Sequence, residues 1–234
     1  MAVHKETYQT IRAELEAKGV TLVAVSKTKP VEDILELYEL GQRDFGENYV
    51  QELVEKAERL PVDIRWHFIG HLQSNKAKYI APFVNLVHGV DSWKLLQEIS
   101  KQGEKNGRVI DCLLQVHIAR EETKFGLDEE ELTVLLRQAA KLNQLNQLNH
   151  VRIRGLMGMA SFSEDMNRVR GEFRNLKRLF DQQAGGAPSL VQFNTLSMGM
   201  SSDYRVAVEE GSNLVRIGSL LFGERTKQPR EDSK

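Results

Sequence analysis

Hydrophobic positions along the chain follow two alternating spacings. Residues 21–26 form a short, uniformly apolar and β-branched run, which predicts a strand buried on both faces. After Pro30, apolar side chains recur at helical spacing, as at Val31, Ile34 and Tyr38. Because runs and helical stripes alternate along the whole chain, the pattern indicates parallel β/α units rather than segregated helices and strands.

The alternation repeats often enough to predict a closed architecture. The predicted strands are residues 21–26, 44–47, 65–69, 86–90, 109–118, 151–159, 195–198 and 214–222. With a leading helix over residues 5–18 and about eight helices between the strands, the 234 residues match an α/β fold, a single (β/α)8 TIM barrel. We expect this barrel over residues 1–225, a flexible tail over 226–234 and no second domain. An open doubly wound sheet is the alternative, although it usually has fewer strands.

Charge and cysteine content narrow the class of protein. The chain has 32 Lys and Arg against 33 Asp and Glu, intermixed along the sequence, which argues against nucleic acid as a partner. The single cysteine, Cys112, excludes an intrachain disulfide and a multi-cysteine zinc site, and its apolar neighbours place it in the core. His67 and His71 lie in a strand end and loop, so they predict no metal site. Without a signal segment or a long apolar stretch, we expect a cytoplasmic protein with no membrane partner.

Lys27 is the first candidate for chemistry. TIM barrels place their functional residues at the carboxyl ends of the strands, and Lys27 closes the first predicted strand. Burial there would disfavour the ammonium and lower its pKa, which leaves a neutral amine able to form a Schiff base. A lysine that extends from the barrel mouth into solvent is the alternative interpretation.

Two glycine- and serine-containing loops follow the last two predicted strands. Ser197, Gly199 and Ser201 follow the seventh strand, and Gly218 with Ser219 follows the eighth. Backbone N–H groups at a helix start, together with hydroxyls, bind anions, and TIM barrels often hold phosphate between these two loops. The alternative for the first loop is a tight turn in which a serine caps the next helix. The pattern favours a phosphate site.

Arg216 interrupts an otherwise apolar run. An inward-facing guanidinium is costly unless it meets a hydrogen-bond acceptor, and Arg216 shares a strand face with Gly218, which favours the interior. Pairing with a helix acid on the outside is the alternative. Four methionines near two strand ends would either line an apolar pocket wall or fill the core. They are Met157, Met159, Met198 and Met200.

Six segments in order along the chain carry a resemblance to a known family. They are AVSKTKP (24–30), FGENYVQE (45–52), WHFIGHLQSNK (66–76), RGLMGM (154–159), LSMGMSSDY (196–204) and VRIGSLLFG (215–223). Each segment is weakly specific, but together they resemble the pyridoxal phosphate homeostasis proteins, which share a fold with the N-terminal domain of alanine racemase.

The resemblance implies a cofactor and the residues that hold it. Pyridoxal 5′-phosphate (PLP) would be bound as an internal aldimine on Lys27, Arg216 would face the pyridine nitrogen and Asn48 would lie near the ring. The residues implied at the phosphate are Ser197, Gly199, Met200, Ser201, Gly218 and Ser219. His67 would lie near the mouth of the barrel. No residue is assigned a catalytic role and no metal is implied.

The resemblance also implies a function, intracellular PLP (vitamin B6) homeostasis with little or no turnover. An arginine at the pyridine nitrogen keeps that nitrogen unprotonated, which weakens the ring as an electron sink. We therefore expect a monomeric carrier that passes PLP to apo-forms of PLP-dependent enzymes. A PLP-dependent amino-acid racemase, with His67 or Tyr204 as general base, is the alternative. A Schiff-base aldolase acting on phosphorylated sugars is a third reading, and a pure scaffold would leave Lys27 and the phosphate loops without a use.

Overall fold

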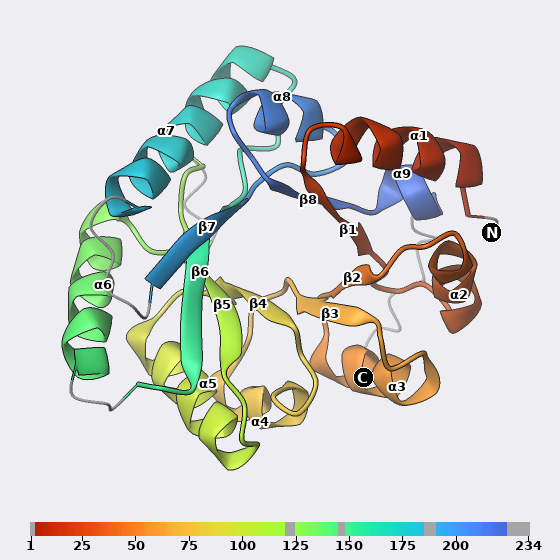
Figure 1. Ribbon diagram of the computed structural model, residues 1–234. Helices are drawn as coiled ribbons and strands as arrows, with labels where there is room; N and C mark the ends of the chain where they lie inside the picture. The colour runs from red at the N-terminus through yellow and green to blue at the C-terminus, as the bar shows by residue number, and fades with distance from the viewer. Residues whose placement is uncertain (1–2, 120–124, 145–147, 185–190, 224–234) are drawn as a thin grey trace, which may run out of the picture.

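Eight parallel strands form a closed barrel in which each strand pairs with its neighbours in chain order (Figure 1). The computed structural model describes residues 3–119, 125–144, 148–184 and 191–223. The strands are β1 (Thr21–Val25), β2 (Asp44–Glu47), β3 (Arg65–Phe68), β4 (Leu86–Val90), β5 (Ile110–Val116), β6 (Val151–Gly158), β7 (Val191–Ser197) and β8 (Leu214–Ile217). Pairing of β1 with β8 closes the ring, so the predicted TIM barrel is confirmed.

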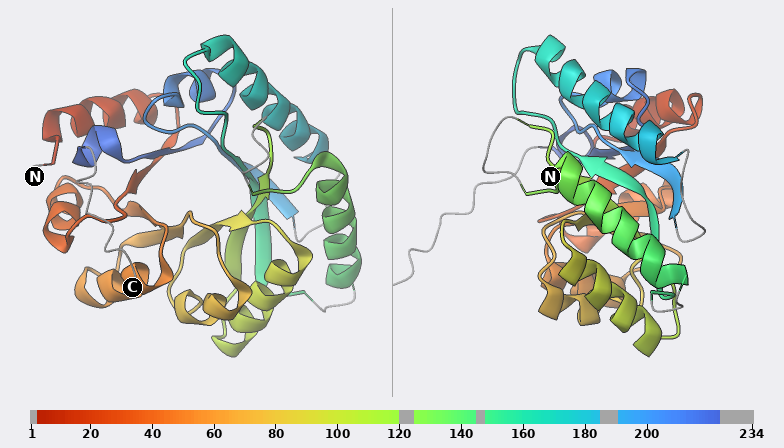
Figure 2. Two further views of the ribbon diagram at one scale, coloured as in Figure 1. Left: turned by 180° about the vertical axis from the view of Figure 1, so that it is seen from behind. Right: turned by 90° about the vertical axis from the view of Figure 1, so that its left-hand side faces the viewer.

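The helices lie around the outside of the strand ring, as the opposite view in Figure 2 also shows. They are α1 (Lys5–Glu16), α2 (Val31–Glu39), α3 (Val50–Arg59), α4 (Ala77–Ile80), α5 (Trp93–Lys105), α6 (Glu129–Gln144), α7 (Met166–Ala184), α8 (Tyr204–Glu209) and α9 (Ser219–Phe222), with a 3-10 turn at Ser74–Lys76. The predicted leading helix is α1, which buries Tyr8, Ile11 and Leu15 at helical spacing.

The alternation of side chains along each strand creates two cores. Outward-facing residues such as Phe45 belong to one hydrophobic cluster with helix residues such as Ile34 and Phe173. Inward-facing apolar residues fill the centre of the barrel. They are Val23, Leu86, Leu113, Met157 and Leu214, with Met159 packed against them. Cys112 is fully buried in the outer core, as expected from its neighbours.

The last predicted strand, residues 214–222, is wrong in its second half. The strand ends at Ile217, and residues Ser219–Phe222 form α9 instead. The backbone carbonyl of Gly218 accepts hydrogen bonds from the N–H groups of Leu221 and Phe222, both at 2.9 Å, which turns the chain into a helix. A short apolar run is compatible with either structure, so only packing separates them. Here α9 lies beside α1, where the His4 N–H donates to the Leu221 carbonyl at 2.8 Å (Figure 1).

The seam between β7 and β8 is held by backbone hydrogen bonds and, in addition, by the side chains of Ser212 and Asn213. Ladder pairing joins Ser197 to Leu214, and Asn213 extends the contact. Its amide oxygen accepts from the Leu196 N–H at 2.8 Å and its amide nitrogen donates to the Asn194 carbonyl at 2.7 Å. The Ser212 hydroxyl lies 2.8 Å from the Met198 carbonyl. These bonds align the two loops that follow β7 and β8.

Two properties of the described residues bear on function. No helix there has the length and apolar composition required to cross a membrane. No group of three or more His, Cys, Asp or Glu side chains in that part of the chain is placed to hold a metal ion. The predicted tail, residues 226–234, lies outside the described residues.

Candidate functional site

A cavity of about 420 Å³ lies at the carboxyl ends of the barrel strands. Its lining comes from the loops or ends of β1, β2, β3, β6, β7 and β8. The lining residues are Val25, Lys27, Lys29, Asn48, Ile69, Met159, Phe162, Met200, Ser201, Ser202, Arg216, Gly218, Ser219 and Gly223. The volume is in the range of small-molecule sites, roughly 300–1,000 Å³, and the lining combines apolar walls with a few polar groups. We call it the mouth cavity.

Most of the residues singled out in the sequence meet in this cavity. Those that line it are Lys27, Asn48, Met200, Ser201, Arg216, Gly218 and Ser219. They come from positions up to 192 residues apart along the chain, and the barrel brings them together because all lie at the same ends of parallel strands. Met159, considered as a pocket wall, is also in the lining, whereas Met157 and Met198 are buried in the cores.

Ser197 and Gly199 do not line the mouth cavity. Ser197, the last residue of β7, points into the barrel, where its hydroxyl contacts Arg216 and His88. Gly199 has φ +97°, and an added Cβ would lie 2.6 Å from the Cβ of Ala207. The glycine therefore permits the turn between β7 and α8, and both residues act behind the lining rather than in it.

The loop that carries Lys27 is held in an unusual backbone conformation. The next residue, Thr28, has φ 63°, in the left-handed region that a β-branched side chain rarely adopts. Its N–H donates to the Glu52 carboxylate at 2.6 Å, and the Lys29 N–H donates to the Ser26 carbonyl at 3.0 Å. These bonds compensate for the strain and determine where Lys27 enters the cavity.

A buried ionic cluster lies beneath this loop. The ammonium of Lys56 donates to the Ser26 carbonyl at 2.8 Å, to Glu47 at 2.8 Å and to Glu52 at 2.7 Å. The Ser26 hydroxyl donates to the same Glu47 oxygen at 2.6 Å, while the other oxygen, Oε2, is buried with no hydrogen-bond partner among the described residues. Burial raises the pKa of Glu47 to about 7 even though Lys56 opposes this change.

The two loops after β7 and β8 contact each other directly. The Ser201 hydroxyl accepts a hydrogen bond from the Gly218 N–H at 3.3 Å. A Cβ added to Gly218 would lie 3.2 Å from the Val25 carbonyl oxygen, so glycine permits close packing against β1. The Met200 N–H is used within its own loop, where it donates to Asp203 at 2.6 Å. The hydroxyls of Ser201 and Ser219, with the first N–H groups of α9, are the available anion-binding groups.

Arg216 faces the barrel interior and the mouth cavity. Its Nη1 donates to the hydroxyl and carbonyl of Ser197, at 2.5 and 3.0 Å, and its Nη2 donates to the Gly158 carbonyl at 3.2 Å. Burial lowers its pKa to about 10, against a smaller opposing effect of Asp203, so the guanidinium remains charged at neutral pH. These bonds use three of its five N–H groups, which leaves two for a ligand.

Sequence reasoning missed Lys29 and Phe162. The Lys29 ammonium is buried and donates to the Phe222 carbonyl at 2.6 Å, which ties the end of α9 to the cavity wall. Its spacing of two residues from Lys27 was a signal that could have indicated a second cavity lysine. Phe162 follows β6 and is 91% exposed although it lines the cavity. An aromatic residue in a loop has no sequence pattern that reveals such a position.

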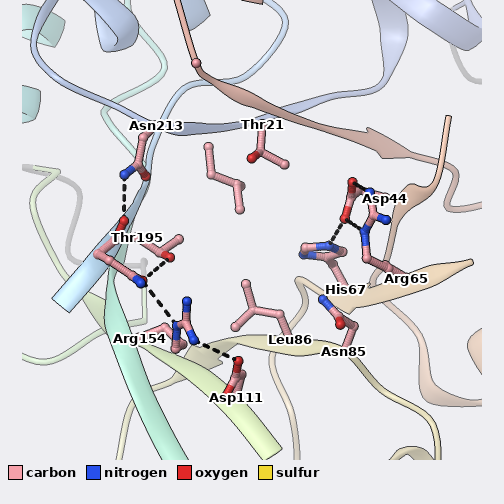
Figure 3. A pocket seen from close by; sticks show the side chains of 13 residues that line it. Thr21, Asp44, Arg65, His67, Asn85, Leu86, Asp111, Arg154, Thr195 and Asn213 are labelled. Carbon is pink, nitrogen blue, oxygen red and sulfur yellow. Dashed lines mark hydrogen bonds and ion pairs between the residues drawn. The ribbon is translucent and has the colours of Figure 1, made fainter. Parts of the chain in front are cut away.

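His67 does not lie near the barrel mouth, which corrects the expectation from the sequence. Its side chain lines a pocket at the amino ends of the strands, shown in Figure 3, together with Asp44 and Arg65 of β2 and β3 and, across from them, Asp111 and Arg154 of β5 and β6. We call it the amino-end pocket. The reason is register, because His67 pairs with Leu86, the first residue of β4, and therefore lies level with the start of that strand.

Tyr204 is also directed away from the mouth cavity. Its hydroxyl lies 3.2 Å from the carboxylate of Glu14 on α1, on the outside of the barrel. Burial raises the pKa of this phenol, with a further contribution from Glu14. The two residues considered as a general base in the sequence, His67 and Tyr204, are therefore both absent from the lining of the mouth cavity.

Comparison with known proteins decides the family. Residues 3–226 match the family described as "Alanine racemase, N-terminal domain". A protein of Aquifex aeolicus named pyridoxal phosphate homeostasis protein is 43% identical over 205 residues, covering 87% of this chain and 86% of the relative. The chain belongs to the pyridoxal phosphate homeostasis protein family. This membership confirms the resemblance carried by the six sequence segments.

Solved structures agree with the assignment to the homeostasis family. PipY of Synechococcus elongatus, solved without PLP, is 38% identical with a TM-score of 0.83, covering 93% of this chain and 99% of that chain. The same protein solved with PLP bound has a TM-score of 0.81 at the same identity and coverage. Alanine racemase of Bartonella henselae is 18% identical with a TM-score of 0.67, covering 92% of this chain and 56% of that one, which shows the fold alone.

Proposed function

We propose that this protein binds PLP in the mouth cavity through Lys27 and serves as a carrier in PLP homeostasis. One observation carries the proposal: an amine, a pair of serine-containing loops and a buried guanidinium line the same cavity. These groups match the aldehyde, the phosphate and the ring nitrogen of PLP. The printed names of the relatives and of the PLP-bound PipY structure support the same cofactor.

Each end of PLP has a chemically suitable group in the cavity. The Lys27 amine would attach to the aldehyde carbon, and the hydroxyls of Ser201 and Ser219 with the backbone at Gly218 would hold the phosphate. Asn48 lies in the lining on the β2 side, where it would meet the ring. Met159 and other apolar residues supply walls for the ring faces. Met200 would contribute its side chain, because its N–H is already bonded to Asp203.

Arg216 explains why turnover would be low. Bound PLP supplies a conjugated ring that can accept electrons from a carbanion, most effectively when its ring nitrogen is protonated. A guanidinium that stays charged at neutral pH disfavours a second positive charge beside it. The two groups considered as a general base, His67 and Tyr204, line other surfaces. The geometry thus supports binding and transfer of PLP more than racemisation.

The proposal includes the recipients expected from the sequence. A bound aldehyde that is not consumed can be released to apo-forms of PLP-dependent enzymes, with the protein acting as a monomeric carrier in the cytoplasm. Mixing the PLP-loaded protein with an apo-enzyme should restore that enzyme's activity as the carrier loses its bound-cofactor absorbance. Retention of PLP by the carrier in the presence of excess apo-enzyme would contradict the carrier role.

The visible absorption spectrum of the protein tests attachment to Lys27. Incubation with PLP should produce a yellow protein, and borohydride reduction followed by peptide mass mapping should place the label on Lys27 rather than Lys29. Lys27→Ala should lose this label, while the surface variant Lys78→Ala should retain it. A colourless, unlabelled wild type would refute PLP binding and favour the sugar-phosphate aldolase. Formation of the D-isomer from L-alanine or L-serine at ordinary enzymatic rates would refute the carrier role.

A further inference from the structure

Five polar side chains form a continuous, buried chain of hydrogen bonds across the barrel interior. Asp44, His67, His88, Ser197 and Arg216 come from β2, β3, β4, β7 and β8, and each is 9% exposed or less. The linking distances are 3.0 Å from Asp44 to His67, 2.9 Å from His67 to His88, 3.2 Å from His88 to Ser197 and 2.5 Å from Ser197 to Arg216. We call these five residues the interior chain.

The interior chain connects two separate pockets. At one end, Asp44 lies in the amino-end pocket, where Arg65 donates to it with Nε at 2.8 Å and Nη2 at 2.5 Å (Figure 3). At the other end, Arg216 lines the mouth cavity. Apolar residues surround the interior chain inside the barrel. Buried polar groups destabilise a protein unless they are hydrogen-bonded, so each member of the chain depends on its neighbours. The chain therefore maintains a specific polar connection through an otherwise apolar core.

The charges at the two ends determine the direction of the two outer hydrogen bonds. Arg216 can only donate, so the Ser197 oxygen accepts from it. Burial opposes ionisation of Asp44, but hydrogen bonds from Arg65 and His67 outweigh this effect and lower its pKa to about 2. Asp44 is then an acceptor at neutral pH, so the Nε2 atom of His67 must carry a hydrogen.

Neutral imidazoles complete the chain in one arrangement. If His67 donates from Nε2, its Nδ1 accepts from Nε2 of His88, and Nδ1 of His88 accepts from the Ser197 hydroxyl. All bonds then point from Arg216 toward Asp44. Burial lowers the pKa of His88 well below 6.5, with further contributions from His67 and Arg216, so this residue stays neutral. Serine can accept from Arg216 and donate to His88 at the same time.

Other charged groups surround the chain on several strands. Asp44 and Arg65 face His67 from β2 and β3, and Asp111 of β5 and Arg154 of β6 line the same amino-end pocket. Arg216 acts on His88, and Asp203 acts on Arg216 from the loop after β7.

We propose that His67, His88 and Ser197 are positioning residues that hold Arg216 in one orientation toward the mouth cavity, with both imidazoles protonated on Nε2. The part concerning the cofactor rests on the proposed function, because Arg216 is the group expected at the PLP ring nitrogen.

Nitrogen NMR of ¹⁵N-histidine-labelled protein without PLP tests the hydrogen-bond arrangement directly. At neutral pH, His67 and His88 should each show a protonated Nε2 and an unprotonated Nδ1. His67→Asn and His88→Asn assign the signals. A neutral His88 protonated on Nδ1 would overturn the arrangement.

PLP binding tests the effect on Arg216. His88→Phe and Ser197→Ala should each raise the PLP dissociation constant about fivefold, the effect of losing one hydrogen bond near the site, and should shift the bound-cofactor absorption band. His150→Asn is the matched control, because that imidazole contacts the Arg108 carbonyl away from the chain. Circular dichroism and thermal unfolding identify any variant that fails to fold. If His88→Phe or Ser197→Ala does not fold, the PLP affinity of the other variant decides whether the interior chain positions Arg216.

The outcomes separate this inference from the proposed function. Failure of the wild type to bind PLP would refute the function, while the NMR result would still decide the hydrogen-bond arrangement. Lys27-dependent binding of PLP with wild-type affinity and spectrum in both His88→Phe and Ser197→Ala would overturn the positioning role alone. Equal loss of affinity in His150→Asn would also overturn it, because the effect would then not depend on the interior chain.

Discussion

Glu47 shows how a single residue near the Lys27 loop can make the protein sensitive to pH. Its carboxyl is fully buried, one oxygen has no hydrogen-bond partner in the described part of the chain, and the other is shared by Ser26 and Lys56. Burial favours the protonated form and Lys56 favours the ionised form, and burial has the larger effect on the pKa. The residue therefore titrates near neutrality in a cluster that supports the Ser26 carbonyl beside Lys27.

Glu47→Gln should remove a pH-dependent part of the stability. The folded-state pKa of about 7 lies above the ordinary value of 4.5, so folding favours protonated Glu47. That stabilisation is fully present below pH 4.5 and is lost as the pH rises through 7. Glutamine imitates the protonated side chain, so the wild type should lose about 3 kcal/mol of unfolding free energy relative to Glu47→Gln across this interval.

Urea unfolding of the cofactor-free protein at about pH 5 and pH 8 measures this difference. Glu55→Gln, which changes an exposed carboxylate on α3 near Lys56, is the matched control and should differ from the wild type by the same amount at both pH values. A difference between wild type and Glu47→Gln that does not change with pH would show that Lys56 keeps Glu47 ionised throughout.

At the scale of elements, the turn between β7 and α8 sets the positions of the anion-binding loops. Gly199 adopts φ +97° and its carbonyl accepts a hydrogen bond from the Arg216 N–H at 3.0 Å, which ties this turn to β8. The Met200 N–H then bonds to Asp203, just before α8 begins. A change at Gly199 would therefore displace Ser201 as well as the backbone beside Arg216.

Gly199→Ala should destabilise the protein by about 1–3 kcal/mol, because the left-handed backbone is strained for alanine and the Cβ would collide with Ala207. PLP affinity should fall in the same variant. Gly171→Ala, inside α7 with open space around the position of the Cβ, should instead stabilise by about 0.5–1 kcal/mol. Urea unfolding and PLP titration measure both effects. Equal stability of the two variants would contradict the role given to the turn.

At the scale of the whole molecule, the mouth cavity and the amino-end pocket lie at opposite ends of the barrel. The mouth cavity collects the loops that follow the strands, whereas the amino-end pocket collects the residues that begin them. Apolar side chains and the interior chain fill the space between. The mouth cavity is formed by residues from both halves of the sequence, so it exists only when the whole barrel is folded. A ligand that binds there should therefore stabilise the entire barrel against unfolding.

PLP should raise the unfolding temperature of the wild type. At a free concentration about 100 times the dissociation constant, binding adds about 2.7 kcal/mol, which corresponds to roughly 5–10 °C for a chain of this size. Pyridoxamine phosphate, which has no aldehyde for Lys27, should give a smaller shift at the same concentration. Lys27→Ala should respond equally to both compounds. A larger response to PLP than to pyridoxamine phosphate in Lys27→Ala would show that another group, such as Lys29, makes the attachment.

The sequence by itself determined the order and type of nearly all elements. Strands buried on both faces are continuous apolar runs and the covering helices have one apolar stripe, so both patterns are visible locally. The carboxyl-end rule for TIM barrels then brought Lys27, Ser201, Arg216 and Ser219 together without any coordinates. These predictions succeeded because strand direction alone decides which end of the barrel a residue occupies.

Tertiary structure decided what depends on packing and register. The run after Gly218 became α9 because it packs beside α1, which its composition does not reveal. Register placed His67 at the amino-end pocket and turned Ser197 inward, since a side chain's depth in the barrel depends on the offset between strands. Burial raises the pKa of Glu47, and the groups that contact its carboxylate include Ser26, 21 residues away in the sequence.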